Sequence, residues 1–286
     1  MIIGKYGLKN GKIVPLDDLK LPFFDLGFLR GYSVFQFMEA HNGVIFYEKE
    51  RIRNLFNYCK EALIDIRGVD YIQNLPGLLK KLIKKNKLER SSVFIRVDIT
   101  AGLTSDSFHP DKNSLPNCLA FCLKSSHKKE PLSLFTYKYE RPAAEAKKSQ
   151  DYFLAEILLK NSPYDDVLYI DSKGNVLETS RKNIFIVKNG VIKTPAKGIL
   201  KGLTRSIVLN LLKKSGEFKV KEANIALDEL YNADEVFITS TSFGVFPVSK
   251  VDKKKFRNPG KITERINEIY SNHKKEYYNR GVIPCL

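Results

Sequence analysis

Cysteine is scarce in this chain, and long apolar runs are missing. The 286 residues include four cysteines, Cys59, Cys118, Cys122 and Cys285. Cys118 and Cys122 share one face of an apolar, strand-like run with no histidine near them in sequence, so we expect packed free thiols rather than a metal site. No apolar run approaches the ~20 residues of a membrane span, and the first residues do not form a signal peptide. The sequence therefore predicts a soluble, cytoplasmic protein kept in a reducing compartment.

The glycine-rich motifs of nucleotide-binding proteins are also missing. The chain contains no GxGxxG, which excludes a typical Rossmann dinucleotide site. A hydroxyl-rich run at residues 239–242 follows an apolar strand, but no Gly-Lys-Ser/Thr accompanies it, as a Walker loop requires. Dinucleotide and P-loop chemistry are therefore not expected.

The charge is strongly unbalanced toward positive. Forty-eight Lys and Arg residues stand against 32 Asp and Glu, which gives a net charge of +16. The lysines are spread along the whole chain in short runs, as on solvated helix faces and loop ends. We therefore predict no nucleic-acid partner, and at most a weak attraction for carboxylate substrates.

The order of predicted elements indicates an α/β (α+β) fold in two domains. A hairpin turning at Asn10-Gly11 opens the chain, and helices are predicted over 49–66, 70–88, 150–161 and 261–278. The short charged segment 125–131 is the best candidate linker. We therefore predict an N-terminal domain over 1–124 and a cofactor-binding domain over 132–286, with the active site between them.

Three segments of the second half carry the chemistry. Glu178 stands at a predicted strand end, and Asn183 follows five residues later at the start of an apolar strand. Gly202-Leu203-Thr204 lies where a loop becomes a helix, and such a helix start suits a phosphate because its N–H groups are free. Thr204 could cap that helix and also donate its hydroxyl. Together these segments suggest a phosphorylated, protonatable cofactor.

These segments resemble the class IV pyridoxal-phosphate aminotransferases, a group that includes branched-chain aminotransferases, D-amino-acid aminotransferases and aminodeoxychorismate lyases. The resemblance extends from about Asp25 to Asp252. It implies that Glu178 hydrogen-bonds the pyridine nitrogen and keeps the ring protonated. It further implies that the phosphate is held by Leu203 and Thr204 with Ser240 or Thr241, and that Asn183 supports the site near Glu178.

The family also requires a lysine that forms a Schiff base with the cofactor and moves protons during the reaction. Lys147 and Lys148 precede a predicted helix at the matching place. The D-amino-acid and lyase branches imply Lys148, and the branched-chain branch implies Lys147. Ser149 favours Lys148, and Lys147 remains the alternative. Asp151 replaces the usual asparagine and would serve as an N-cap.

Several departures from the family pattern concern the phosphate and the substrate. The usual His-x-x-Arg-Leu becomes Arg51-Ile-Arg-Asn54-Leu, so Asn54 stands where an arginine normally clamps the phosphate. Arg51 is then the candidate that could reach the phosphate from another direction. Gln36 and Gly244 replace common glutamates. The segment 99–102 lacks the arginine of the D-amino-acid branch, which argues against D-amino-acid specificity.

The resemblance implies a homodimeric fold-type-IV enzyme that binds pyridoxal 5'-phosphate and moves an amino group from an amino acid to a 2-oxo acid. In such dimers the partner's N-terminal domain completes the substrate pocket. Two alternatives stay open. One is aminodeoxychorismate lyase, which eliminates pyruvate with the same lysine. The other is a degenerate homologue without catalysis, which the changes at Asn54, Gln36 and Asp151 would favour.

Overall fold

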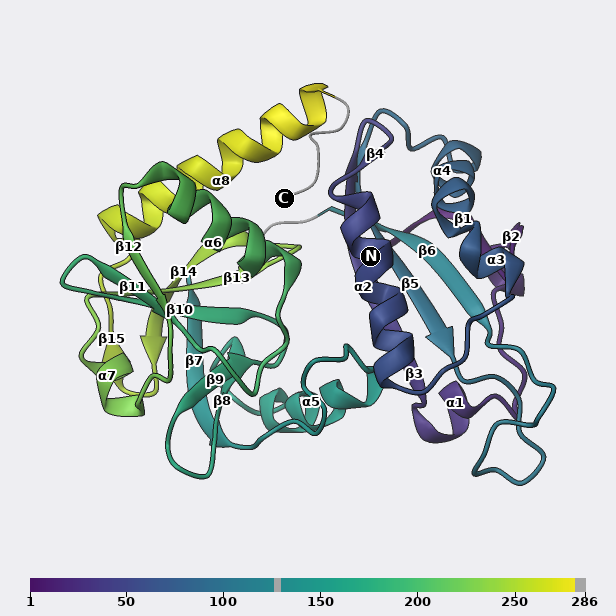
Figure 1. The fold of residues 1–286 in the computed structure, drawn as a ribbon, viewed down its shortest axis with the longest axis horizontal. Helices are drawn as coiled ribbons and strands as arrows, with labels where there is room; N and C mark the ends of the chain where they lie inside the picture. Colours follow the sequence, from purple (N-terminus) through teal and green to yellow (C-terminus); the bar gives the residue numbers. More distant parts are fainter. Residues whose placement is uncertain (126–129, 281–286) are drawn as a thin grey trace. The chain divides into compact units, whose positions relative to one another are not determined.

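The computed structural model describes residues 1–125 and 130–280, and the contacts between residues divide the chain into two compact units (Figure 1). Unit 1 includes residues 1–125 and also the short segment 146–150, which follows the predicted linker in sequence. Unit 2 includes 130–145 and 151–279. Most of the predicted linker at 125–131 lies outside the described residues, as does Cys285. Within the described ranges no helix is long and apolar enough to cross a membrane.

Unit 1 is built on a six-stranded sheet with the order β2-β1-β6-β5-β3-β4. Its strands are β1 (Ile2–Lys9), β2 (Lys12–Pro15), β3 (Ser33–His41), β4 (Val44–Ile45), β5 (Ser92–Thr100) and β6 (Cys118–Lys124). The predicted hairpin is confirmed, because β1 and β2 pair antiparallel around Asn10 and Gly11, both of which have a positive φ. That conformation is the one a tight two-residue hairpin requires.

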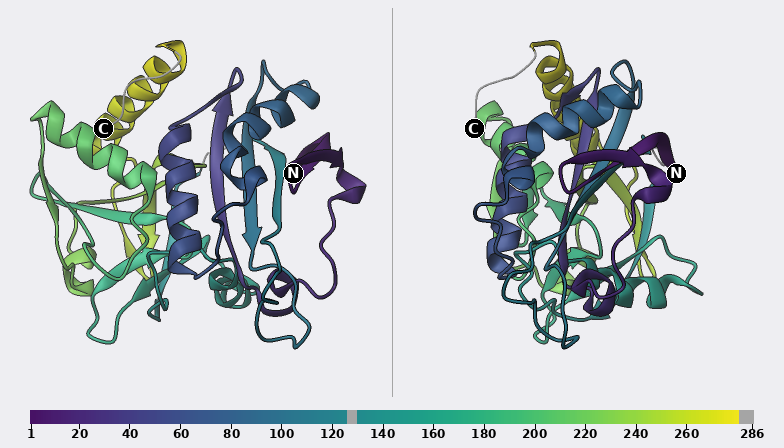
Figure 2. Two further views of the ribbon diagram at one scale, coloured as in Figure 1. Left: turned by 45° about the vertical axis from the view of Figure 1, so that its right-hand side comes forward. Right: turned by 90° about the vertical axis from the view of Figure 1, so that its right-hand side faces the viewer.

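Unit 1 contains four helices among its described residues, and two of them pack on the sheet. The helices are α1 (Leu26–Arg30), α2 (Glu48–Glu61), α3 (Asp70–Gln73) and α4 (Leu75–Lys85), and the 3-10 turn η1 (Leu16–Asp18) precedes them. Figure 2 shows α2 and α4 beside one another against the sheet, and both helices contact its strands. The single helix predicted over 70–88 is wrong in one respect, because the structure has two helices with Asn74 between them. Pro76 lies in the first turn of α4, where its missing N–H is tolerated but cannot continue the hydrogen bonding of α3.

The cysteines of unit 1 are packed thiols, as predicted. Cys59, Cys118 and Cys122 are free and buried. Burial raises the pKa of Cys59 and of Cys118 to about 12, and that of Cys122 to about 11. These thiols therefore behave as small apolar side chains of the core.

Unit 2 contains a nine-stranded sheet that closes on itself. The order is β12-β11-β10-β13-β14-β7-β8-β9, with β15 paired to β14 and a further pairing between β9 and β10. Its strands are β7 (Leu132–Lys138), β8 (Asp166–Ile170), β9 (Val176–Thr179), β10 (Asn183–Lys188), β11 (Val191–Thr194), β12 (Lys219–Glu222), β13 (Glu235–Ser240), β14 (Gly244–Val251) and β15 (Lys254–Lys255). The extra pairing joins β10, β13, β14, β7, β8 and β9 into a ring around buried aliphatic side chains.

The helices of unit 2 begin differently from the sequence-based expectation. They are α5 (Phe153–Leu159), α6 (Leu203–Ser215), α7 (Leu227–Tyr231) and α8 (Lys261–Arg280), and the 3-10 turn η2 spans Ser149–Tyr152. Asp151 does not cap α5, whose N-cap is Tyr152, because Asp151 lies inside η2 with its carboxylate buried. Thr204 does not cap α6 either, since Gly202 is the N-cap and Thr204 lies within the first turn.

Candidate active site

Three polar residues lie side by side on neighbouring strands of unit 2. Glu178 on β9 stands opposite Asn183 on β10, and Asn183 stands opposite Thr239 on β13. Both pairs of strands are antiparallel, so residues directly opposite one another point to the same face. Each of the three side chains is at most 5% exposed. The pairing register therefore places a carboxylate, an amide and a hydroxyl in one buried row.

Glu178 is held by donors from three parts of unit 2. Its Oε1 accepts a hydrogen bond from the Leu200 N–H at 2.7 Å and another from Arg141, and its Oε2 accepts one from the Asn183 amide at 3.0 Å. Asn183 uses its other N–H on the carbonyl of Leu200, at 2.7 Å. The sequence prediction that Asn183 supports Glu178 thus agrees with a direct hydrogen bond between them. A buried carboxylate with these donors is stabilised in its charged form.

Arg141 is the residue that the sequence prediction missed. Its side chain and that of Glu178 are 4% and 5% exposed, and Asp151 lies 3.8 Å from its Nη1. Burial lowers the pKa of Arg141, but attraction to Glu178 and Asp151 outweighs that effect and raises it overall. The sequence contains only an indirect indication, because a buried glutamate needs a cationic partner but its sequence pattern does not identify which arginine that partner is.

The turn between β9 and β10 is fixed by a second buried ion pair. Lys182 Nζ lies 2.6 Å from Asp166 Oδ2, and the Ser180 hydroxyl donates to Asp166 Oδ1 at 2.5 Å. The Lys182 and Asp166 side chains are only 8% and 2% exposed. The anchored turn therefore fixes how β9 and β10 pair, and this pairing places Glu178 opposite Asn183 in the row.

The start of α6 approaches the same row. Gly202 packs so closely that a Cβ atom there would lie 2.4 Å from the Asn183 Oδ1. No side chain caps the helix, which leaves the first-turn N–H groups of Leu203 and Thr204 as donors. Arg205 anchors this turn from behind, since its guanidinium donates to the Pro195 carbonyl at 2.7 Å and to Glu222 at 2.9 Å. The predicted phosphate donors at 203–204 are therefore rigidly placed beside Asn183.

The hydroxyl run at the end of β13 divides into different roles. The Thr239 hydroxyl is buried and has no hydrogen-bond partner among the described residues. Ser240 accepts a hydrogen bond from the Phe243 N–H at 3.2 Å and so closes the turn into β14. Thr241 lies in that turn and is partly buried. The sequence prediction named Ser240 or Thr241, whereas the buried hydroxyl without a partner among the described residues belongs to Thr239.

Both candidate lysines belong to the short segment that packs with unit 1. Lys148 forms a β-bridge with Val34, and the Lys147 carbonyl accepts a hydrogen bond from the Phe35 N–H at 3.0 Å. The Lys147 ammonium lies 4.8 Å from the centre of the Phe35 ring, within range of a cation–π contact. Neighbouring side chains of an extended segment point to opposite sides, so the two lysines face different surroundings.

Arg51, the proposed substitute for the missing phosphate arginine, is buried inside unit 1. Its Nε donates to the Phe46 carbonyl at 3.0 Å and its Nη1 to the Phe37 carbonyl at 2.8 Å. Gln36 donates to the Arg51 carbonyl, and Arg53 is exposed. These contacts give Arg51 a structural role within the unit, and its phosphate role stays a prediction.

Comparison with known proteins places the chain in a family. The sequence model described as Amino-transferase class IV matches residues 33–251. A putative branched-chain-amino-acid aminotransferase of Methanocaldococcus jannaschii is 33% identical over 91% of this chain and 93% of its own length. A D-alanine aminotransferase of Listeria monocytogenes serotype 4b is 30% identical, with 92% and 94% covered. The chain belongs to the class IV aminotransferase family.

Solved structures agree with this assignment. A branched-chain aminotransferase of Thermoproteus uzoniensis with norvaline superposes with a TM-score of 0.86 over 98% of this chain and 99% of that one. At 23% identity, this similarity supports the fold alone. A T.th. branched-chain amino acid aminotransferase complexed with N-(5'-phosphopyridoxyl)-L-glutamate has a TM-score of 0.84 at 26% identity, covering 95% and 94%. None of these four proteins is named a lyase. The fold-type-IV prediction is confirmed, and the protein is a class IV aminotransferase that acts on amino acids and 2-oxo acids.

The residues of unit 2 fit the cofactor of this pyridoxal-phosphate-dependent family. A protonated ring nitrogen needs a carboxylate acceptor, which the buried Glu178 supplies. A phosphate needs several N–H or O–H donors, which the uncapped start of α6 and the unpartnered Thr239 hydroxyl supply. An orphaned buried hydroxyl is costly without a ligand, so its presence beside Asn183 favours a bound acceptor.

Proposed function

We propose that this class IV aminotransferase binds pyridoxal 5'-phosphate on unit 2 and transfers the amino group of branched-chain L-amino acids, with Lys148 as its Schiff-base lysine. The observation that carries the proposal is the donor set of Glu178. A carboxylate that is 3% exposed yet receives N–H groups from Leu200, Arg141 and Asn183 is built to remain charged. A charged acceptor at this place suits a protonated ring nitrogen.

When bound, the cofactor supplies an aldehyde that captures the substrate amine and a ring that accepts the electron pair of the substrate α-carbon. Glu178 would hold the proton on the ring nitrogen by accepting a hydrogen bond from it. Arg141 and the Leu200 N–H keep Glu178 in position and in its charged form. Leu203, Thr204 and Thr241 would donate hydrogen bonds to the phosphate, together with Thr239.

Lys148 would take the proton from the substrate α-carbon and return it in the second part of the reaction. Lys147 remains the alternative. The Lys147 ammonium lies 4.8 Å from the centre of the Phe35 ring, and the serine that follows Lys148 favours Lys148.

Branched-chain L-amino acids are proposed as donors for two reasons. The M. jannaschii relative carries that description, although D-alanine aminotransferases are similar at 30% identity. In addition, the end of β5 offers no arginine for a substrate carboxylate. Ala101 stands there before Gly102, and the neighbouring Thr100 is buried and donates its hydroxyl to Asp25 at 2.8 Å.

The test loads the purified protein with pyridoxal 5'-phosphate and supplies 2-oxoglutarate with single amino donors. L-leucine, L-isoleucine and L-valine should each react at least about tenfold faster than D-alanine. Faster turnover of D-alanine would overturn the donor assignment. Lys148→Ala should abolish both turnover and the visible absorbance of the bound cofactor, with Lys147→Ala as the matched control. Loss in Lys147→Ala alone would move the catalytic role by one residue.

We also propose that the enzyme is a cytoplasmic homodimer. Three aromatic rings around α1 are largely exposed, Phe23 at 65%, Phe24 at 58% and Phe28 at 63%. The centroid of the Phe23 ring lies 5.3 Å from that of Phe24 and 5.5 Å from that of Phe28. An exposed aromatic cluster of this kind is typical of a protein interface. The free buried thiols of unit 1 are compatible with the reducing cytoplasm.

Sedimentation of the wild-type protein and of Phe28→Glu tests the dimer. The wild type should sediment as a dimer, and a buried charge in the aromatic cluster should shift the variant toward monomer. Phe153→Glu is the control, since Phe153 is an aromatic residue of unit 2 that is similarly exposed, at 71%. A monomeric wild type, or an unchanged Phe28→Glu dimer, would overturn the use of this surface.

A further inference from the structure

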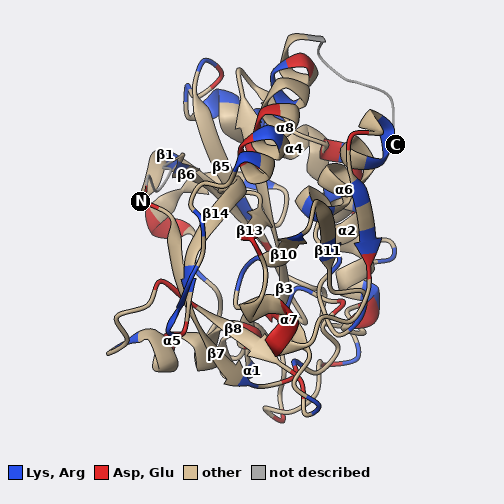
Figure 3. Ribbon diagram, turned by 90° about the vertical axis from the view of Figure 1, so that its left-hand side faces the viewer, with Lys and Arg blue, Asp and Glu red and all other residues tan. Residues whose placement is uncertain are grey.

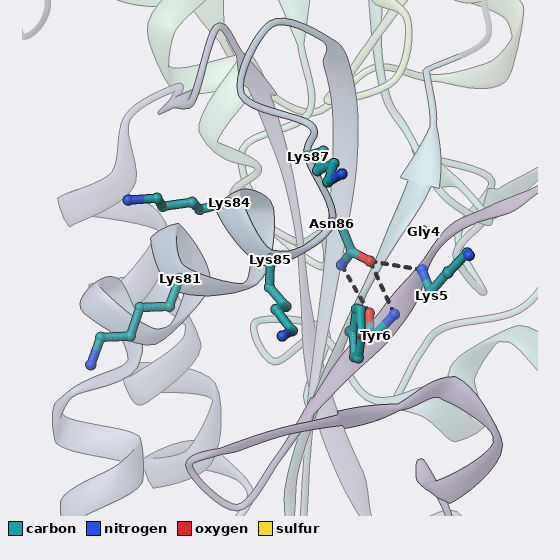
Figure 4. A pocket seen from close by; sticks show the side chains of 8 residues that line it. All are labelled: Gly4, Lys5, Tyr6, Lys81, Lys84, Lys85, Asn86 and Lys87. Atoms are coloured by element: carbon teal, nitrogen blue, oxygen red, sulfur yellow. Dashed lines mark hydrogen bonds between the residues drawn. The ribbon is translucent and has the colours of Figure 1, made fainter.

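A pocket separate from the residues of the candidate active site lies in unit 1, between the last turn of α4 and the start of β1 (Figure 4). Its volume is about 1020 Å³, which is the size of a small-molecule site. Five of its eight lining residues are lysines and none is acidic: Gly4, Lys5, Tyr6, Lys81, Lys84, Lys85, Asn86 and Lys87. We name this feature the lysine pocket.

The charge of the lysine pocket is not compensated within the protein. None of its five ammonium groups forms an ion pair with a described residue, whereas Lys80 on the same helix pairs with Glu48 at 3.0 Å. Lys84 and Lys85 in the last turn of α4 interact favourably with the helix dipole. That explanation does not extend to Lys5, which comes from another element. Figure 3 shows Lys and Arg on many other elements, so what distinguishes this site is the concave grouping.

The backbone that carries these lysines is rigid. Asn86 Oδ1 accepts hydrogen bonds from the N–H groups of Lys5 and Tyr6 at 2.8 and 3.0 Å, and Asn86 Nδ2 donates to the carbonyls of Tyr6 and Leu82. Figure 4 shows this amide joining the two elements, with Lys85 beside Tyr6. Gly4 has a φ of +87°, and a Cβ there would lie 2.4 Å from Asn86 Oδ1. The backbone positions that carry the lysines of β1 and α4 are thus joined to one another, and the exposed side chains extend from them.

One lysine occupies a backbone position that would suit glycine better. Lys87 follows the C-cap of α4 with a φ of +58°, in the left-handed region where glycine is preferred. A lysine there is less stable than a glycine, and Leu63 has the same conformation after the C-cap of α2. Strained residues of this kind concentrate at ligand sites.

We propose that the lysine pocket binds a small polyphosphate, a chain of three or more phosphate groups either free or carried by a nucleoside. Lysine ammonium groups act as point charges that suit phosphate oxygens, whereas planar carboxylates are better matched by arginine, which does not line the pocket. Several linked phosphates can contact several ammonium groups at once and relieve their mutual repulsion. A concave site of this size favours a small ligand over an extended macromolecular surface.

The experiment uses the full chain loaded with pyridoxal 5'-phosphate, so that the phosphate site of unit 2 is already filled. Tripolyphosphate is titrated in a calorimeter at 50 mM and 300 mM NaCl, and ATP is titrated under the same conditions. Binding should weaken at the higher salt concentration, because exposed charges are screened. Equal affinities for the two ligands would show that the phosphate chain is recognised, and tighter binding of ATP would show that the nucleoside adds contacts. Both results support the proposal.

Two charge-matched variants decide whether the pocket is the site. K5Q/K84Q/K85Q removes three exposed cations of the pocket, and K253Q/K254Q/K255Q removes three exposed cations of unit 2. The first should weaken tripolyphosphate binding about 10- to 100-fold and the second less than about twofold. An equal loss of tripolyphosphate affinity in both variants would mean that binding depends only on the net charge of the protein, and this would overturn the proposal. So would the absence of saturable binding at 50 mM NaCl, or much tighter binding of single-stranded RNA than of either ligand.

Discussion

The ion pair between Arg141 and Glu178 yields a quantitative prediction for the stability of unit 2. Arg141→Met keeps much of the side-chain length and removes the charge. Both partners are at most 5% exposed, and loss of one partner from a buried pair costs about 3–5 kcal/mol because the other charge remains buried. Leu200 and Asn183 still donate to Glu178 in the variant. We therefore expect the lower end of this range, about 3 kcal/mol, in the cofactor-free protein.

Urea unfolding of the cofactor-free variant measures this loss. Arg181→Met is the matched control, because Arg181 pairs with Glu156 on the same unit but the two side chains are 52% and 62% exposed. An exposed pair contributes about 0–1 kcal/mol, so the control should barely change the unfolding free energy. The loaded protein gives a second measurement: Arg141→Met should bind pyridoxal 5'-phosphate more weakly, whereas Arg181→Met should bind it as the wild type does.

A double-mutant cycle separates the pair from other effects of the substitution. Glu178→Gln removes the buried charge, so Arg141→Met should cost clearly less in that background than in the wild type. A coupling energy of more than about 1.5 kcal/mol is expected for residues in direct contact. If Arg141→Met costs less than about 1 kcal/mol, or if the two substitutions are additive, the buried-pair argument is refuted.

Three further predictions follow from the same unit and from the thiols of unit 1. Gly202→Ala should lower the free energy of unfolding by about 1–3 kcal/mol and weaken cofactor binding, because its Cβ would lie 2.4 Å from Asn183 Oδ1. Gly77→Ala is the control and should leave stability unchanged or raise it, because there is open space around Gly77. Equal unfolding midpoints of the two variants in urea would contradict this. Thr239→Val removes a buried hydroxyl that has no partner among the described residues, so the cofactor-free protein should be equally stable or more stable by about 1 kcal/mol. The same change should weaken cofactor binding, because it removes a donor to the phosphate. Unchanged affinity in a cofactor titration would exclude Thr239 from the site. Burial raises the pKa of Cys118 from 9.0 to about 12, so the unfolded chain releases this proton first as the pH rises, and stability present below pH 9 is lost toward pH 12. The loss in the free energy of unfolding is about 1.4 kcal/mol at pH 10. The free energies from urea unfolding at pH 8 and at pH 10 should therefore differ less in Cys118→Val than in the wild type, by about this amount. An unchanged difference would contradict the argument.

Local patterns in the sequence were sufficient for much of the fold. The Asn10-Gly11 turn and the spacing of apolar residues predicted the first hairpin and the helix α2, because both depend on neighbours along the chain. The predicted helix over 70–88 is divided at Asn74, because Pro76 has no N–H for the hydrogen bond that would join α3 to α4, and apolar spacing alone does not show this break. The capping roles of Asp151 and Thr204 were wrong, since each side chain is instead buried by tertiary contacts that sequence spacing does not reveal.

The site was predictable where one segment contains the partners. Glu178 and Asn183 are five residues apart, and the turn between their strands brings them into contact. Arg141 lies 37 residues from Glu178 in sequence, and only the tertiary fold joins them. The register of β10 and β13 likewise selects Thr239, rather than its neighbours, for the buried row. Such contacts depend on strand order, which single-sequence patterns do not determine.

The turn of Ser180, Arg181 and Lys182 limits how this enzyme can evolve. Its side chains can be exchanged if the buried pair with Asp166 is replaced by other well-packed groups. Its length has no such freedom, because a change of one residue would turn β10 over and send Asn183 to the opposite face. A deletion would bring the apolar Ile184 into the place of Asn183, and an insertion would bring Lys182 there. Variation between related enzymes should therefore alter the composition of this turn and leave its number of residues constant.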